Sequence, residues 1–173
     1  QKTLLADAVT LTAPGIPMLL QGSEFLQEGA FNDWQALDWD LPEAHANFVL
    51  AHKHLIDLRT NLYGNTTGLT GQSTKILQLD NDNKLISYHR WDRGGPDDDV
   101  IVVANFGANT LRDYSFLAPR TGGWIVRFNS SWSGYGDDFP NLELESVEVD
   151  SDKKFTLEIP AYCLLIFSQN PKD

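Results

Sequence analysis

The chain begins with a pattern of apolar residues at helical spacing. The residues that repeat every three or four positions are Leu4, Leu5, Ala8 and Leu11. This spacing predicts a helix over residues 1–13, which the Pro14-Gly15 pair ends. The next apolar run, residues 16–20, shows no alternation and predicts a short strand that is covered on both faces. A helix, a turn and a buried strand are typical of one repeat of a parallel α/β fold.

A second helix is predicted after a long loop. Residues 25–41 are rich in aromatic and acidic side chains, and loops of this length inside compact domains are usually functional or flexible. Asp40 and Glu43 have the spacing of a capping box, with Pro42 in the first turn. The apolar residues that follow keep helical spacing: Phe48, Ala51, Leu55, Leu58 and Leu62. We expect this helix to end at Gly64.

From residue 65 onward the pattern becomes that of β-structure. Short runs of β-forming residues alternate with turns rich in Gly, Asn and Asp. The predicted strands are 75–79, 84–91, 100–106, 111–116, 123–128, 142–149, 154–159 and 162–168. About eight strands at this spacing predict an antiparallel β-sandwich. The predicted fold class is mainly β, with a helix–strand–helix unit in residues 1–65 and an all-β domain in residues 66–173.

The composition indicates a chain that can bury a hydrophobic core and that is not expected to bind polyanions. Of its 173 residues, 42% are hydrophobic and 11% aromatic, and the formal net charge is −11. An acidic protein is not expected to bind nucleic acid or anionic lipid. The apolar runs are far shorter than the ~20 residues of a membrane helix. The chain does not begin with Met, and we expect it to be a piece of a larger protein.

Few residues have the spacing that metal or nucleophilic chemistry requires. The four histidines are His45, His52, His54 and His89. No two of them have the four-residue spacing of a helical zinc site, and we interpret the helix histidines as solvated. Cys163 lies in an apolar run and is expected to be an inert core thiol. The acidic run 97–99 is interpreted as solvated turn charges. Neither a metal nor a cofactor is predicted.

Two regions carry the ingredients of a sugar-binding site. Glu24 and the loop 25–41 bring several carboxylates next to aromatic rings, which suits glycosidic chemistry and equally a solvated acidic loop. In the β part, Trp132 and Tyr135 lie in a Gly- and Ser-rich loop where exposure is expected, and exposed rings pack against the apolar faces of sugars. Trp124 lies early in a predicted strand and is expected to be a core residue.

One segment strongly resembles a known family. Its residues Gly15, Pro17, Gly22 and Glu24 match the pattern Gly-x-Pro, four residues, Gly-x-Glu. This pattern belongs to the last barrel strand of the α-amylase superfamily (glycoside hydrolase family 13). The segments that look most like the 1,4-α-glucan branching enzymes are Trp34, 37–39 and 55–59, together with 100–106, 124–136 and 159–162 in the β part. Ser23 departs from the family, in which Gln is more usual.

The resemblance implies a fold and a set of binding residues. Residues 1–65 would be the last helix–strand–helix of a (β/α)8 barrel, in which the active site lies at the carboxyl ends of the strands. The side chains expected to contact an α-glucan are Gln21, Glu24 and Trp34 on the rim of the cleft, and Trp132 and Tyr135 in the β domain. The family's catalytic carboxylates would all precede Gln1. The resemblance therefore implies no catalytic residue in this chain and no activity for the chain alone.

Three other interpretations fit the same sequence: a free-standing carbohydrate-binding β-sandwich, a structural module, and part of an α-amylase or trehalose-forming hydrolase of the same superfamily. The expected partners are an α-glucan, the enzyme's own upstream barrel and, through the orphaned strand 16–20, a second copy of the chain. Nucleic acid and membranes are not expected partners. Nothing in the sequence indicates secretion, and we expect a cytoplasmic protein.

Overall fold

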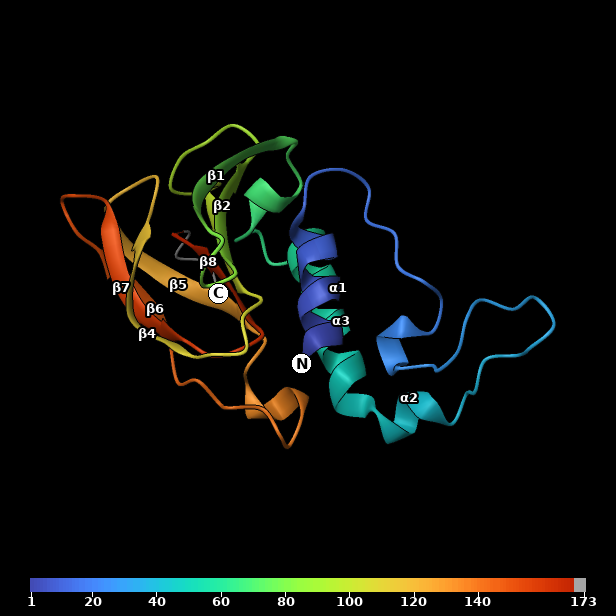
Figure 1. The fold of residues 1–173 in the computed structure, drawn as a ribbon. Coiled ribbons are helices and arrows are strands. Elements are labelled where there is room, and N and C mark those ends of the chain that lie inside the picture. The colour runs from blue at the N-terminus through green and yellow to red at the C-terminus, as the bar shows by residue number, and fades with distance from the viewer. Residues whose placement is uncertain (170–173) are drawn as a thin grey trace.

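A six-stranded antiparallel sheet forms the middle layer of the computed structural model, which describes residues 1–169 (Figure 1). The strands across it are β1 (Ser73–Asp80), β2 (Leu85–Trp91), β3 (Val100–Asn105), β8 (Cys163–Ser168), β5 (Gly122–Asn129) and β6 (Ser146–Val149). A second sheet pairs β4 (Leu111–Leu117) with β7 (Lys154–Ile159). All neighbouring strands within the described residues are antiparallel, which confirms the predicted mainly β fold.

The central strand β3 is apolar along most of its length because both of its faces are covered. Successive side chains of a strand point to opposite faces. Val100 and Val102 therefore pack on the helical side of the sheet, whereas Ile101 and Val103 pack toward the β4–β7 sheet. The apolar runs that predicted these strands thus correspond to a middle layer with a hydrophobic core on each side.

Two core predictions in the β part are confirmed. Trp124 is fully buried between the two sheets, and its indole nitrogen donates to the Arg120 carbonyl at 3.3 Å. Cys163 is also fully buried, and its burial raises the pKa of the thiol to about 11. A thiol that is protonated and inaccessible at neutral pH is chemically inert.

Both predicted helices are present, but their ends differ from the prediction. Helices α1 (Lys2–Thr12) and α3 (Ala46–Arg59) pack together on the open face of the six-stranded sheet (Figure 1). Asp40 makes no side-chain capping bond, and the expected first turn is a separate short helix, α2 (Leu41–Ala44). Since the helices share a core with the sheet, the division of the chain at residue 65 stays a prediction.

Helix α3 ends at Arg59, before the predicted Gly64. Asn61 adopts a left-handed conformation with φ of 56°. Its N–H donates to the Leu58 carbonyl at 3.1 Å, and the Leu62 N–H donates to the Asp57 carbonyl at 2.9 Å. These two bonds form a Schellman motif, in which an asparagine takes the position that a glycine usually occupies.

The predicted buried strand at residues 16–20 is not formed. This segment has no strand pairing, and the side chains of Ile16 and Met18 are 97% and 87% exposed. The prediction was wrong because a buried strand needs hydrogen-bonded neighbours and covering side chains, and residues 1–169 place neither beside it. After the short 3-10 helix η1 (Ser23–Phe25), the loop 26–40 extends away from the rest of the structure (Figure 1).

Candidate functional site

The C-terminal end of α1, from which the chain continues toward the predicted rim, is held by an arginine of α3. Carbonyl groups at this end of a helix have no helical partners. Arg59 donates hydrogen bonds to the carbonyl oxygens of Leu11, Ala13 and Gly15, the Ala13 bond being 2.8 Å long. The positive guanidinium also interacts favourably with the helix dipole at this position.

A second arginine reaches the same end of α1 from the sheet. Arg90 of β2 is fully buried, and it donates to the carbonyl oxygens of Thr12, Leu69, Gly71 and Ser73. The Leu69 carbonyl belongs to the 3-10 helix η2 (Thr67–Leu69). Arg90 therefore links α1, η2 and β1, so that the sheet fixes the point at which the chain leaves toward the rim.

Gly22 turns the chain at the rim. It has φ of 87°, a conformation that side-chain-bearing residues rarely adopt, and a Cβ at this position would lie 2.6 Å from the Gln27 Cβ. Its carbonyl accepts from the N–H groups of Phe25 and Gln27 at 3.2 and 2.9 Å. This turn leaves Gln21 exposed before η1 and places Glu24, which is half-buried, within η1.

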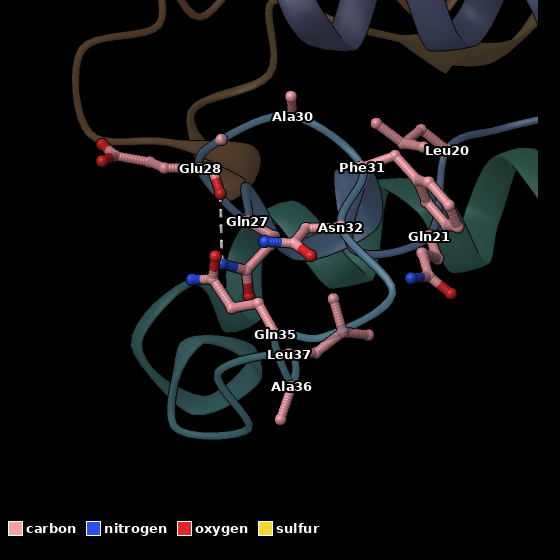
Figure 2. A pocket seen from close by; sticks show the side chains of 11 residues that line it. Leu20, Gln21, Gln27, Glu28, Ala30, Phe31, Asn32, Gln35, Ala36 and Leu37 are labelled. Atoms are coloured by element: carbon pink, nitrogen blue, oxygen red, sulfur yellow. Dashed lines mark hydrogen bonds between the residues drawn. The ribbon is translucent and has the colours of Figure 1, made fainter.

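A small hollow lies between this turn and the following loop (Figure 2). Leu20, Gln21 and Phe31 lie on one side of it, and Glu28 and Gln35 lie on the other. Its volume of about 30 Å³ has room for about one water molecule, so the hollow itself does not hold a sugar ring. Gln21 therefore belongs to an open surface that a ligand would contact from outside.

The loop beyond the turn carries exposed aromatic rings. Trp34 is 96% exposed, and Phe31 and Trp39 are exposed as well. A hydrogen bond connects the two ends of this loop: the Asp38 N–H donates to Oε1 of Gln27 at 2.8 Å. Trp34 is therefore available as a flat apolar surface for a ligand or for another protein segment.

Behind η1, a buried histidine joins the two long helices. His52 Nε2 lies 3.0 Å from Asp7 Oδ2, and its Nδ1 lies 3.1 Å from the Phe48 carbonyl oxygen. Burial lowers the pKa of His52, but these bonds and the charges of Asp7 and Glu24 outweigh it, so the pKa is raised above its usual value. The interpretation of His52 as a solvated helix residue was wrong, because α1 packs directly over it.

The two aromatic residues predicted in the β domain differ in exposure. Tyr135, in the 3-10 helix η3 (Ser133–Tyr135), is only 6% exposed. Its ring stacks on Phe128, its hydroxyl lies 2.6 Å from His54 Nδ1, and burial raises the pKa of the phenol. Its predicted exposure was wrong, and so was the solvated interpretation of His54. Trp132 is 44% exposed and rests edge-on against Tyr135.

The structure does not bring the five predicted binding residues together. Helix α3 packs against η1 on one side and against η3 on another, and it separates the two groups (Figure 1). The members of the first group are Gln21, Glu24 and Trp34, and those of the second are Trp132 and Tyr135. They therefore form two distinct surfaces, and a single small sugar would contact only one of them.

The acidic run 97–99 has a structural role that the sequence analysis missed. Asp98 is buried and accepts hydrogen bonds from the backbone N–H groups of Asp92, Arg93 and Gly94. Its neighbour Asp99 is buried as well. The interpretation of these two residues as solvated turn charges was therefore wrong.

Asp99 lies between the side chains of a histidine and an arginine. Its carboxylate is 2.9 Å from His89 Nε2 and 2.5 Å from Arg120 Nε. Burial raises its pKa, but the bonds from His89 and Arg120 outweigh this, so the pKa lies below its usual value. Throughout residues 1–169, no group of three or more His, Cys, Asp or Glu side chains is arranged to hold a metal ion, and no helix there is long and apolar enough to cross a bilayer.

Comparison with known proteins gives consistent results for both parts of the chain. Residues 76–170 match the model of the α-amylase C-terminal all-β domain. The chain is 31% identical over 143 residues to a 1,4-α-glucan branching enzyme of Methylococcus capsulatus, covering 80% of this chain and 19% of that protein. It is 31% identical over 166 residues to a branching enzyme of Pseudomonas syringae, covering 90% of this chain and 22% of that protein.

The fold is shared with two solved structures, a pullulanase and an α-amylase. The pullulanase of Paenibacillus barengoltzii superposes with a TM-score of 0.65 and 22% identity, covering 96% of this chain and 25% of that one. The α-amylase of H. orenii superposes with a TM-score of 0.61 and 16% identity, covering 99% of this chain and 35% of that one. The chain spans about a fifth of the length of the curated relatives that it matches.

Proposed function

This chain belongs to the family of α-amylase C-terminal all-β domains, and we propose that it is the C-terminal section of a 1,4-α-glucan branching enzyme. The observation that carries this proposal is the similarity to branching enzymes along the chain. An alignment over 90% of the residues necessarily includes most of the helical part as well as the β part. The similarity is therefore not confined to a β domain that many glucan-active enzymes share.

In this proposal, the surface around Gln21, Glu24 and Trp34 forms part of the rim of the glucan cleft. The side chains of Gln21 and Trp34 are exposed, and the bonds of Arg59 and the turn at Gly22 position the chain on either side of residues 16–21. A neutral glucan is bound by hydrogen bonds and by aromatic rings, which an acidic chain with exposed tryptophans can supply. Phosphate groups would instead require a basic surface.

The chemistry of branching requires two carboxyl groups that another part of the enzyme would contribute. One attacks C1 of a glucosyl unit as the other delivers its proton to the departing O4, which breaks the α-1,4 bond. The hydroxyl O6 of a second glucan then displaces the first carboxylate from C1 and returns a proton to the second carboxylate. We assign this chain no acid and no nucleophile, and we propose that it is inactive alone.

The exposed apolar segment 16–20 suggests where the rest of the enzyme packs. Ile16 and Met18 are almost fully exposed, and the backbone groups of this segment have no strand partner in residues 1–169. We propose that neighbouring strands of the enzyme's own barrel cover this segment. Such strands would give the backbone groups of this segment the hydrogen-bonding partners that residues 1–169 do not provide.

The test is an assay of the full-length protein that carries this chain, with amylose as substrate. We expect α-1,6 linkages to appear in the proton NMR spectrum without a matching increase in reducing ends. Reducing ends without new α-1,6 linkages would contradict the proposal and favour a hydrolase of the same superfamily. The isolated chain is expected to change neither signal, and chain transfer by the isolated chain would overturn its assignment as non-catalytic.

The role of the rim is tested separately in the full-length enzyme. We expect Trp34→Ala to raise KM for amylose about tenfold, the effect of losing one aromatic contact, while kcat changes much less. Tyr63→Ala removes an exposed aromatic residue after α3, outside the proposed rim, and provides the matched control. Equal kinetic constants for the Trp34 variant and the unmodified enzyme would remove Trp34 from the binding surface.

A further inference from the structure

A groove opens in the β-sandwich where β6 leaves the edge of β5. The two strands pair only from Gly122 with Val149 to Ile125 with Ser146. The predicted strand at 142–149 is therefore shorter than expected, and residues 141–145 run beside β5 with few bonds to it. The Val126 N–H donates to the Glu145 carbonyl at 2.8 Å, and Asn129 Nδ2 donates to the Leu142 carbonyl at 2.7 Å.

Between this part of β5 and residues 141–145 lies a groove, here called the Trp132 groove, which has a volume of about 640 Å³. Its lining comes from residues 126–129 of β5, from Trp132 and Tyr135, and from residues 141–145. This volume lies in the usual range for sites that bind small molecules, unlike the hollow of about 30 Å³ beside Gln21. The groove is therefore much larger than that hollow, and it lies away from the proposed rim.

Trp132 is held in a defined orientation at the groove. Its ring meets Tyr135 at 90° with the ring centroids 4.9 Å apart, and its backbone N–H donates to the Asn129 carbonyl at 3.1 Å. Gly134 lies directly under the ring, where an added Cβ would overlap the indole. Tyr135 is fixed in turn by His54 and Phe128. The half-exposed indole is thus a rigid flat surface whose position does not have to be ordered upon binding.

The opposite wall of the groove is polar. Leu142 and Leu144 point inward and pack against the core, so the alternate residues Asn141, Glu143 and Glu145 are exposed. Carboxylates accept hydrogen bonds and carboxamides both donate and accept them, which suits the hydroxyl groups of a sugar. The two carboxylates outnumber the one arginine of the lining, Arg127, and the chain has a net charge of −11, so an anionic ligand is disfavoured.

We propose that the Trp132 groove is a second, non-catalytic α-glucan site, at which a glucosyl ring stacks on Trp132 and its hydroxyl groups bond to the 141–145 wall. The identity of the sugar rests on the proposed function. The site would hold the polymer on the β domain while another segment of it occupies the catalytic cleft. Such a linked second site raises the effective concentration of polymer at the cleft without changing the chemistry.

The experiment is a titration of the ¹⁵N-labelled 173-residue chain with maltoheptaose, followed by NMR. The chain contains five tryptophans, and the indole signal that disappears in Trp132→Phe is that of Trp132. We expect maltoheptaose to shift this signal and the amide signals of residues 126–145 saturably, and to the same extent at low and high salt. Cellohexaose, with its β-1,4 linkages, is expected to bind at least several-fold more weakly.

Three variants separate the site from a general effect on the fold. Trp132→Ala is expected to weaken binding about tenfold. Gly134→Ala keeps every lining side chain but displaces the indole, and it is expected to weaken binding as well. Phe106→Ala removes an aromatic ring that is exposed to the same fraction, 44%, but lies outside the groove, and it should leave the affinity unchanged. Dispersed NMR spectra verify that each variant is folded.

Several outcomes would overturn the proposal. These are the absence of saturable shifts, equal affinity of the Trp132→Ala variant, and equal binding of both oligosaccharides. Tighter and salt-sensitive binding of oligolysine would assign the groove to a cationic peptide instead. None of these results depends on branching by the full-length protein, so this inference and the proposed function can fail independently.

Discussion

The β-sandwich and the segment 14–41 place the same kinds of side chain in opposite environments. Trp124 and Val102 are fully buried between packed layers, whereas Trp34 and Ile16 project almost entirely into solvent. The two regions have similar apolar content over these stretches, so hydrophobicity alone does not decide which residues are covered. The sandwich supplies partners for most of its apolar side chains. In the segment 14–41, Phe25 is buried, but Ile16 and Trp34 have no such cover within residues 1–169.

This difference distinguishes residues that stabilise the fold from residues that are available for contact. Burial of an apolar side chain contributes on the order of 2 kcal/mol to folding, and an exposed side chain contributes almost nothing. The segment 14–41 therefore keeps apolar surface that is free for contact with another protein segment or, under the proposed function, with a glucan. The boundary between the two regions is the end of α1, where Arg59 and Arg90 donate hydrogen bonds to the free carbonyl groups.

The largest difference in the free energy of unfolding is expected between alanine variants of two tryptophans. Trp124→Ala should lower the free energy of unfolding by about 3–5 kcal/mol, because it leaves a cavity between the two sheets. Trp34→Ala should change it by less than about 0.5 kcal/mol, because the ring has no buried contacts. Urea unfolding followed by far-ultraviolet circular dichroism measures both. Similar values for the two variants would mean that the loop 26–40 packs against the rest of the chain.

The next effect concerns the link between the two regions. Arg90→Met keeps an apolar stem but leaves the carbonyl groups of Thr12, Leu69 and Gly71 without this donor, and we expect a loss of about 3 kcal/mol. Hydrogen exchange should also become faster at the end of α1. Arg93→Met, at an exposed arginine of the same part of the chain, is the control. An unchanged exchange rate in α1 would show that Arg90 does not position this helix.

A smaller effect depends on pH and tests how the helices hold together. The folded-state pKa of His52 lies above its ordinary value of 6.5, so the folded chain favours protonated His52. The stabilisation is complete below pH 6.5 and is lost as the pH rises through the folded-state pKa. His52→Gln should therefore cost about 1–3 kcal/mol at pH 5 and less at pH 9. His45→Gln is the control, and a cost that does not change with pH would contradict this prediction.

The strands were predictable from the sequence because each depends on a local pattern. Runs such as 100–106 and 154–159 correspond closely to β3 and β7, since apolar residues and turn residues bound them within a few positions. Ends that depend on specific hydrogen bonds were less predictable. The Asp40 cap is absent, and Asn61 rather than Gly64 ends α3.

Contacts between distant residues were beyond the reach of sequence patterns. His52 pairs with Asp7 and Arg90 reaches Thr12 only because α1 packs on α3 and on the sheet. Tyr135 looked like an exposed loop residue, but its loop folds back onto α3 and buries it. The prediction for Trp132, made from the same Gly- and Ser-rich loop, was better, because its side chain is 44% exposed. A sequence pattern also does not reveal when the neighbouring strands that a buried strand needs are missing, as residues 16–20 illustrate.

The smallest expected effect on stability concerns this orphaned segment. The double substitution Ile16→Ser and Met18→Ser replaces side chains that touch little else, and we expect the free energy of unfolding to change by less than about 0.5 kcal/mol. The same substitution should abolish self-association if two isolated chains pair through residues 16–20, as exposed apolar backbone segments tend to do. Sedimentation velocity over a range of concentrations measures this association.

We expect the unmodified isolated chain to associate as concentration rises and the double variant to stay monomeric. The variant Ile76→Ser and Leu79→Ser, on the exposed side of the edge strand β1, is the matched control because it removes two similar side chains from another unpaired edge. If the control variant loses association instead, the edge of the sandwich pairs, and residues 16–20 are no interface between isolated chains. Under the proposed function, the barrel of the full-length enzyme would cover residues 16–20. Association through these residues should therefore be absent in the full-length enzyme, and its presence would contradict the proposed packing of this segment against the barrel.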